Sequence, residues 1–95
     1  MMGAPYVAVI DNRAEVAGQV QDAPKPDPDR PGFSEVQVLV TGSGALEGWP
    51  NLFARDSGSC VTVYVPDAML DRFRPGATVR FIAKKSGPGT AVALP

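Results

Sequence analysis

The chain contains no histidine and only one cysteine, Cys60, among its 95 residues. A single cysteine excludes an internal disulfide. The absence of histidine excludes Ser-His-Asp and Cys-His catalysis, and it removes the usual ligands of most metal sites. Acidic residues are scattered, and neither a nucleophile–base pair nor a phosphate-binding glycine loop is recognisable. We therefore predict no enzymatic activity, no metal and no cofactor.

Long apolar runs and strong net charge are also lacking. No run approaches the roughly 20 apolar residues that cross a bilayer, and the start MMGAPYVAVIDNR lacks the basic region of a signal peptide. We predict a soluble cytoplasmic protein with no membrane partner. The net charge of −1 hides an asymmetry, because residues 1–59 carry eight acids and four bases, and residues 60–95 carry two acids and five bases. An anionic ligand should favour the C-terminal half.

Glycine and proline are plentiful, with ten of each, and this favours turns and short strands over a helical bundle. A chain of this length is predicted to form one domain over residues 1–95. Residues 22–32 form an exposed proline-rich loop, because proline lacks the backbone donor of an inner strand. Residues 41–59 form a long irregular loop. Residues 1–11 either begin a long first strand or form an extra N-terminal strand.

The hydrophobic period changes twice between Ser59 and Ala83. Residues 60–65 alternate like a half-buried strand, with Val61, Val63 and Val65 on one face. Asp67 is then expected to be an N-cap. Met69, Leu70 and Phe73 form one apolar stripe, which predicts a helix of about two turns. The Pro75-Gly76 pair turns the chain into a second alternating strand, with Val79, Phe81 and Ala83 on one face.

Three further strands are predicted. One runs from Asn12 to Val20, where Gly18 indicates a bulge or bend. Another covers residues 33–40, in which valines alternate with other residues. Residues 52–54, within the irregular loop, are expected to pair with the strand at 60–65. The last strand is 90–94. A short helix between the third and fourth strands of a small all-β protein predicts a five-stranded OB-type β-barrel.

The order of these motifs resembles the single-stranded DNA-binding proteins and the related short primosomal protein PriB. The resemblance rests on Asn12-x5-Gly18-x-Val20 followed by Pro24, on the strand VTVYV with its short helix, and on Arg74-Pro-Gly76-Ala-Thr-Val79. It covers roughly residues 12–94. It implies an OB-fold that binds single-stranded DNA or RNA with little sequence preference, acts in DNA replication and forms a homodimer.

The resemblance also implies the nucleic-acid-binding residues. Stacking and phosphate contacts would come from the strands and from the loop at 41–59, through Trp49, Phe53, Arg55, Tyr64, Arg80, Lys84 and Lys85. Other interpretations stay open. Tyr64 is either a stacking platform or a strand residue chosen for β-propensity, and Trp49 is either a ligand contact or a lid on the barrel. Arg80, Lys84 and Lys85 either contact phosphate or only form a solvated face that keeps an edge strand from aggregating.

Two functions follow from this pattern. The first is a module that binds single-stranded nucleic acid by aromatic stacking and phosphate contacts. The alternative is a barrel that docks a protein partner or self-assembles without binding nucleic acid. A single concave face shared by Tyr64, Arg80, Lys84 and Arg55 would favour nucleic-acid binding, whereas a two-fold-related copy filling that face would favour assembly.

Overall fold

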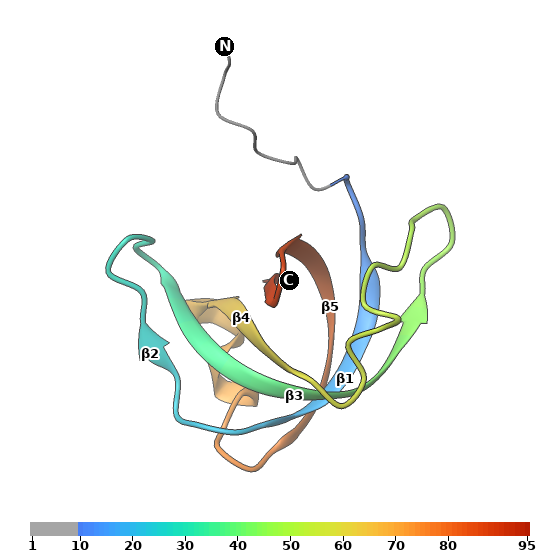
Figure 1. Cartoon of the computed structure of the whole chain (residues 1–95). Helices are drawn as coiled ribbons and strands as arrows, with labels where there is room; N and C mark the ends of the chain where they lie inside the picture. Colours follow the sequence, from blue (N-terminus) through green and yellow to red (C-terminus); the bar gives the residue numbers. More distant parts are fainter. Residues whose placement is uncertain (1–9) are drawn as a thin grey trace.

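The computed structural model describes residues 10–95, which form six strands and one short helix (Figure 1). In chain order these are β1 (Ala14–Val20), β2 (Lys25–Pro26), β3 (Phe33–Ala45), β4 (Cys60–Pro66), the helix η1 (Asp67–Arg72), β5 (Thr78–Gly87) and β6 (Thr90–Leu94). Among these residues no helix has the length and apolar content needed to span a membrane.

Five strands close into a barrel. The order around it is β1-β5-β6-β4-β3, and β1 pairs with β3 to close the circle. All neighbours are antiparallel except β4 and β6, which run parallel. The helix η1 lies between β4 and β5 in the chain. This confirms the predicted small all-β OB-type barrel with its short helix between the third and fourth barrel strands.

The predicted inward faces are buried. Valines of four strands and aromatic residues of the helix end and β5 form one core, which includes Val16, Val36, Val38, Val61, Val63, Phe73, Val79 and Phe81. Each barrel strand alternates between buried and more exposed residues. This period of two is what a sheet with one face on the core and one toward water requires. Outward residues on neighbouring strands therefore form rows across the barrel surface.

Gly18 lies at the predicted bulge. The register between β1 and β3 shifts between Ala17 and Gly18, so that Gly18 faces Val40 whereas Ala17 faces Gly42. Thr41 is the extra residue of β3, and beyond it Ser43 takes the position opposite the buried Val16. A side chain at Gly18 would meet the Leu39 carbonyl oxygen at 2.6 Å. Glycine is thus required where β1 bends between its two neighbours.

The helix differs from the prediction in its type and its cap. It is a six-residue 3₁₀ helix whose N-cap is Pro66, and Asp67 is its first residue and makes no side-chain cap. The prediction that Asp67 is the N-cap is wrong, because β4 continues through Pro66 and leaves no intervening position. The apolar stripe is confirmed, since Met69 and Phe73 are buried and Leu70 packs against the core.

The two long loops also differ from the sequence pattern. β3 continues to Ala45 through a glycine-rich stretch because β1 pairs with it there, and the irregular loop is therefore residues 46–59. The proline-rich loop contains β2, which pairs with β3 at its edge. Residues 52–54 are turns and do not pair with β4, so that prediction is wrong. The strand predicted within residues 1–11 lies outside the described residues up to Val9, and Ile10–Asp11 are not a strand.

The loops lie on opposite sides of the barrel. In Figure 1 the proline-rich loop with β2 is on the left, and the loop of residues 46–59 is on the right beyond the end of β3. The strands β4 and β6 and the end of β5 lie between them. Side chains of both loops can therefore flank the outward residues of these strands.

Candidate nucleic-acid interface

Tyr64 lies in an outward row that crosses four strands. The register pairs it with Glu35 on β3 and with Val92 on β6, and Val92 in turn pairs with Lys84 on β5. All four side chains are half-buried. Adjacent strands are about 4.8 Å apart, so Tyr64 and Lys84 are separated by roughly 10 Å across the sheet. The row thus places an aromatic ring, an aliphatic side chain and an ammonium group side by side.

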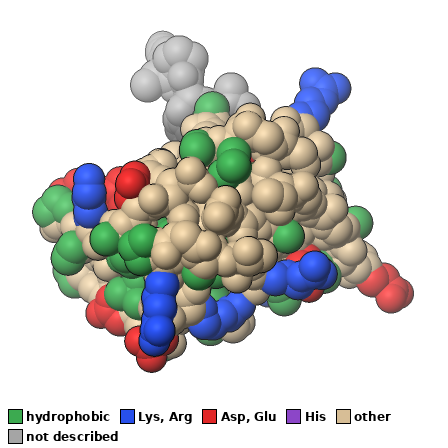
Figure 2. Space-filling model, turned by 90° about the horizontal axis from the view of Figure 1, so that it is seen from below, with side chains coloured by type: hydrophobic (Ala, Val, Ile, Leu, Met, Phe, Trp, Pro, Cys, Tyr) green, Lys and Arg blue, Asp and Glu red, His purple; other side chains and the backbone are tan. Residues whose placement is uncertain are grey.

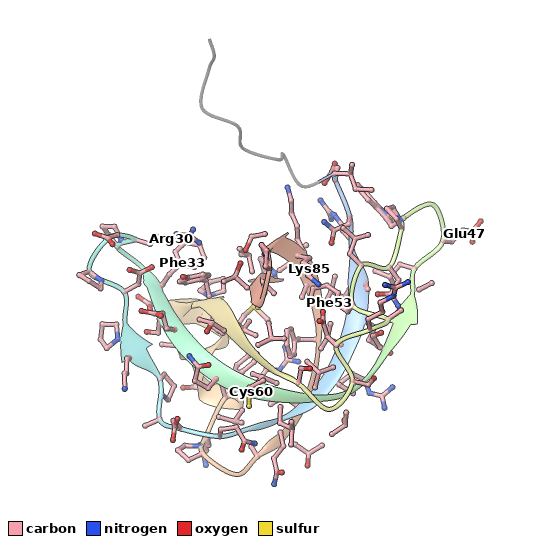
Figure 3. All side chains as sticks on the ribbon, viewed as in Figure 1. Arg30, Phe33, Glu47, Phe53, Cys60 and Lys85 are labelled. Atoms are coloured by element: carbon pink, nitrogen blue, oxygen red, sulfur yellow. The ribbon has the colours of Figure 1, made fainter. Side chains whose placement is uncertain are left out.

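Arg30 covers one end of this row. Its guanidinium carbon lies 4.1 Å from the centre of the Tyr64 ring, which is cation–π geometry. A turn positions it, because the Asp27 carboxylate accepts a hydrogen bond from the Asp29 amide at 2.9 Å and the Arg30 carbonyl accepts one from the Phe33 amide at 3.1 Å. Figure 3 shows Arg30 and Phe33 together at the left end of the molecule. Sequence reasoning missed Arg30, since no local pattern links it to Tyr64.

A second cation–π pair lies at the other end. The Arg13 guanidinium carbon is 4.7 Å from the centre of the Trp49 ring. Arg13 comes one residue before Ala14, which pairs with Ala83, so the continued register sets it beside Lys84. The Lys84 ammonium lies 3.5 Å from the Asp11 carboxylate. Arg13 was also missed, and its position depends on the closure of β1 against β5.

We call these residues the aromatic-basic strip. It consists of the outward residues Tyr64, Val92 and Lys84, with Arg30 on Tyr64 at one end and the stacked Arg13 and Trp49 at the other. Trp49 is half-buried and lies against an exposed arginine. Three of the seven predicted binding residues, Trp49, Tyr64 and Lys84, are thus brought together.

Lys85 points the other way, toward the end of the barrel under the loop. Its ammonium donates hydrogen bonds to the Asp56 carboxylate at 3.0 Å and the Leu52 carbonyl at 3.3 Å. The side chains of Lys85 and Asp56 are 22% and 17% exposed. A shallow hollow of about 270 Å³ adjoins it, lined by Asn51, Leu52, Ala54, Arg55 and Lys85. Lys85 fastens the loop to the barrel, and the exposed Arg55 lies beside it.

Phe53 belongs to the core. It is 1% exposed and packs among the buried valines, and its amide is fixed by the Asn51 side-chain oxygen at 2.8 Å. Figure 3 shows Phe53 close to Lys85 beneath the loop. The prediction that Phe53 stacks on a base is wrong, because its ring is enclosed by the protein. Of the two loop aromatics, Phe53 closes the barrel end and Trp49 stays at the surface.

Arg80 lies apart from the strip. It is outward on β5, four residues from Lys84 and hence about 13 Å along the strand. Its guanidinium lies 3.3 Å from the Glu15 carboxylate, and its carbonyl accepts a hydrogen bond from Arg72. The pair borders a hollow of about 250 Å³ over small residues of β1 and β3, lined by Glu15, Ala17, Gly42, Ser43, Gly44 and Arg80. Arg80 and Tyr64 therefore do not form one patch.

The charges of this surface are mixed. Arg80, Lys84 and Lys85 each have a carboxylate partner within 4 Å: Glu15, Asp11 and Asp56 respectively. The exposed pairs Arg80–Glu15 and Lys84–Asp11 contribute little to stability, whereas the Lys85–Asp56 pair is mostly buried. Figure 2, which views the barrel from below, likewise shows basic and acidic side chains interspersed.

Comparison with protein-family models, with curated proteins and with solved structures finds no match to this chain. The predicted relation to single-stranded DNA-binding proteins and PriB stays a prediction.

Proposed function

We propose that this barrel binds single-stranded nucleic acid along the aromatic-basic strip. The observation that carries the proposal is the row in which Val92 and Lys84 lie between two arginine-covered aromatic rings, Tyr64 and Trp49. Unpaired bases stack on aromatic rings whatever their sequence, for about 1–3 kcal/mol each, whereas paired bases in a duplex are not available for stacking. The strip therefore suits a single strand of low sequence preference.

The arginines supply the second half of the interaction. A base that takes the place of Arg30 over the Tyr64 ring releases the guanidinium to a phosphate, and Arg13 over Trp49 behaves in the same way. Lys84 lies between them and exchanges Asp11 for phosphate. Because the carboxylates of Asp11 and Glu35 lie beside the strip, we expect weak, micromolar binding that falls steeply with salt.

Fluorescence anisotropy of a labelled dT oligomer of about 30 nucleotides tests the proposal, with duplex DNA as a competitor. Trp49 is the sole tryptophan, so its quenching reports directly on the strip. We expect single-strand binding, quenching of Trp49, and a decrease of about 0.7 in log K per tenfold salt for each phosphate contact. No binding at low salt would refute the proposal.

Matched variants locate the site. Lys84→Gln and Arg13→Gln should each weaken binding several-fold and lower the salt dependence by about one contact. Arg74→Gln removes the same charge from an exposed turn at the opposite end of β5 and should leave binding unchanged. Tyr64→Leu keeps an apolar strand residue but removes the ring, and should weaken binding with no change in the salt slope. Equal losses in Arg74→Gln and Lys84→Gln would indicate attraction to overall charge, not to the strip.

The absence of enzymatic activity, a role in replication and a cytoplasmic location stay predictions.

A further inference from the structure

Glu35 is the outward residue of β3 that lies directly opposite Tyr64. The two residues pair in the antiparallel β3–β4 register, and both side chains are half-buried on the outer surface of the barrel. Directly opposed residues of an antiparallel pair have their Cβ atoms about 4.5–5.5 Å apart. The Glu35 side chain therefore stands beside the Tyr64 ring, at the edge of the ring that faces β3.

The carboxylate of Glu35 is not engaged by the rest of the barrel. Within residues 10–95, the ion pairs and the hydrogen bonds to carboxylates involve four other acids, Asp11, Glu15, Asp27 and Asp56. Lys25 pairs with Glu35 in the β2–β3 register, but no ion pair joins their side chains. Both oxygens of this half-buried carboxylate are therefore available as hydrogen-bond acceptors for a ligand on Tyr64.

The two flanks of the Tyr64 ring differ in their chemistry. On the β6 side its neighbour is Val92, whose side chain forms no hydrogen bond, and Lys84 follows on β5. The face of the ring already carries a planar group, because the Arg30 guanidinium carbon lies 4.1 Å from the ring centre. A nucleotide that takes this place gains most when its phosphate lies toward Lys84 and the hydrogen-bonding edge of its base lies toward Glu35.

We propose that Glu35 selects guanine for the nucleotide that stacks on Tyr64, an inference that rests on the proposed function. The Watson–Crick edge of guanine carries two adjacent donors, the N1–H and the N2 amino group, which match the two oxygens of a carboxylate. Thymine and uracil present one donor between two carbonyl oxygens. Adenine and cytosine present one amino group beside a ring nitrogen that accepts. The carboxylate thus receives two hydrogen bonds from guanine and is repelled by part of the edge of every other base.

Three labelled oligomers of about 30 nucleotides test the selection by fluorescence anisotropy at low salt. One is all thymidine, the second alternates thymidine with deoxyguanosine, and the third alternates thymidine with deoxyinosine. Hypoxanthine, the base of deoxyinosine, is a purine that keeps the N1–H of guanine but lacks the amino group, so it controls for the stronger stacking of a purine. A matched bidentate pair discriminates by about fivefold or more, and half of the registers place guanine on Tyr64. We therefore expect the guanine oligomer to bind about threefold or more tightly than the hypoxanthine oligomer.

A matched pair of variants separates base selection from charge. Glu35→Gln keeps the size of the side chain but replaces one acceptor oxygen with an amino group. It should abolish the preference for guanine over hypoxanthine, and it should bind the thymidine oligomer at least as tightly as the wild type does, because a negative charge beside the strip is lost. Asp11→Asn makes the same change of charge at the other end of the strip, beside Lys84. It should tighten binding of all three oligomers and keep the preference for guanine.

The outcomes distinguish this inference from the proposed function. Equal affinities of the wild type for the guanine and hypoxanthine oligomers, with thymidine binding intact, would overturn the role of Glu35 and leave single-strand binding in place. A preference for guanine that survives in Glu35→Gln, or that is lost equally in Asp11→Asn, would also overturn it. Failure of all three oligomers to bind at low salt would refute both proposals. Near-UV circular dichroism checks that each variant is folded.

Discussion

At the scale of single residues, Gly18 is the position where backbone geometry allows no side chain. An added Cβ would lie 2.6 Å from both the Leu39 carbonyl oxygen and a Val38 methyl group. The carbonyl belongs to a paired strand and cannot move aside without breaking the barrel closure between β1 and β3.

We therefore predict that Gly18→Ala lowers the free energy of unfolding by about 1–3 kcal/mol, through overpacking. Gly44→Ala is the control, because a Cβ there meets open space and the backbone is not left-handed. It should be neutral or slightly stabilising, since glycine is a poor strand residue. Urea unfolding of both variants measures the difference in free energy. Equal free energies of unfolding would contradict the prediction and show that the β3 backbone shifts at the bulge to accommodate the Cβ.

Asn12 is a fully buried polar residue, which the sequence analysis used as the start of a predicted strand and as part of the family resemblance. Its amide nitrogen donates to the carbonyls of Ile10 at 2.8 Å and Lys85 at 3.1 Å, and its amide oxygen accepts from the Lys85 amide at 2.8 Å. Just before β1 begins, the Asn12 side chain thus makes the hydrogen bonds to the β5 backbone that a neighbouring strand would otherwise make.

Asn12→Ala should lower the free energy of unfolding by about 2 kcal/mol or more, because it leaves the backbone amide and carbonyl of Lys85 without their hydrogen-bond partner. Gln21→Ala serves as the comparison, because within residues 10–95 that exposed side chain donates one hydrogen bond, to the nearby Gln19 carbonyl, and its loss should lower the free energy of unfolding by less than about 0.5 kcal/mol. Thermal unfolding of both variants measures the difference. Similar melting temperatures would mean that water replaces the Asn12 amide.

At the scale of elements, η1 depends on its packing. A six-residue 3₁₀ helix is too short to be stable alone, and it is attached to the core by its buried residue Met69 and by the buried Phe73 at its C-cap. The Phe73 ring at its end meets Phe81 of β5 edge-on, with centroids 5.2 Å apart and planes at 66°. The helix therefore fills the barrel end between β4 and β5.

Phe73→Ala should lower the free energy of unfolding by about 3–5 kcal/mol, by removing a fully buried ring and its edge-on contact with Phe81. Asp71→Ala changes an exposed residue of the same helix and should cost less than about 0.5 kcal/mol. Denaturant unfolding with unchanged m-values would attribute the loss to the native state. A small effect of Phe73→Ala would mean that the helix does not plug the core.

At the scale of the whole molecule, the loop of residues 46–59 is part of the barrel. Phe53 anchors it from within the core, and Lys85 holds it from β5 through Asp56 and the Leu52 carbonyl. Trp49 in this loop should therefore report on global unfolding.

We expect the unfolding curves from Trp49 fluorescence and far-UV circular dichroism to coincide, as in a two-state transition. Lys85→Met, which keeps the aliphatic stem but removes the ion pair, should move both curves to lower denaturant together. Arg55→Met, a neighbouring exposed cation, should move neither. A fluorescence change that precedes the loss of strand signal would show that the loop opens separately.

The alternation of apolar residues in 33–40, 60–65 and 78–83 determined these barrel strands and their inward faces, because a period of two depends only on neighbours in the chain. Gly18 likewise marked the bulge. The extension of β3 through Thr41–Ala45 could not be predicted, since pairing with β1 outweighs the poor strand propensity of glycine.

Only the tertiary structure decided which loop aromatic enters the core and which partner each basic residue contacts. Phe53 and Trp49 lie four residues apart in the same loop, but the end of the barrel accepts the Phe53 ring and leaves Trp49 against Arg13. Arg30 meets Tyr64 across 34 positions of the chain, and Arg80 is drawn to Glu15 by the closure of β1 on β5. Local pattern sets which face of a strand is buried, whereas contacts between side chains distant in sequence depend on how the strands register and close.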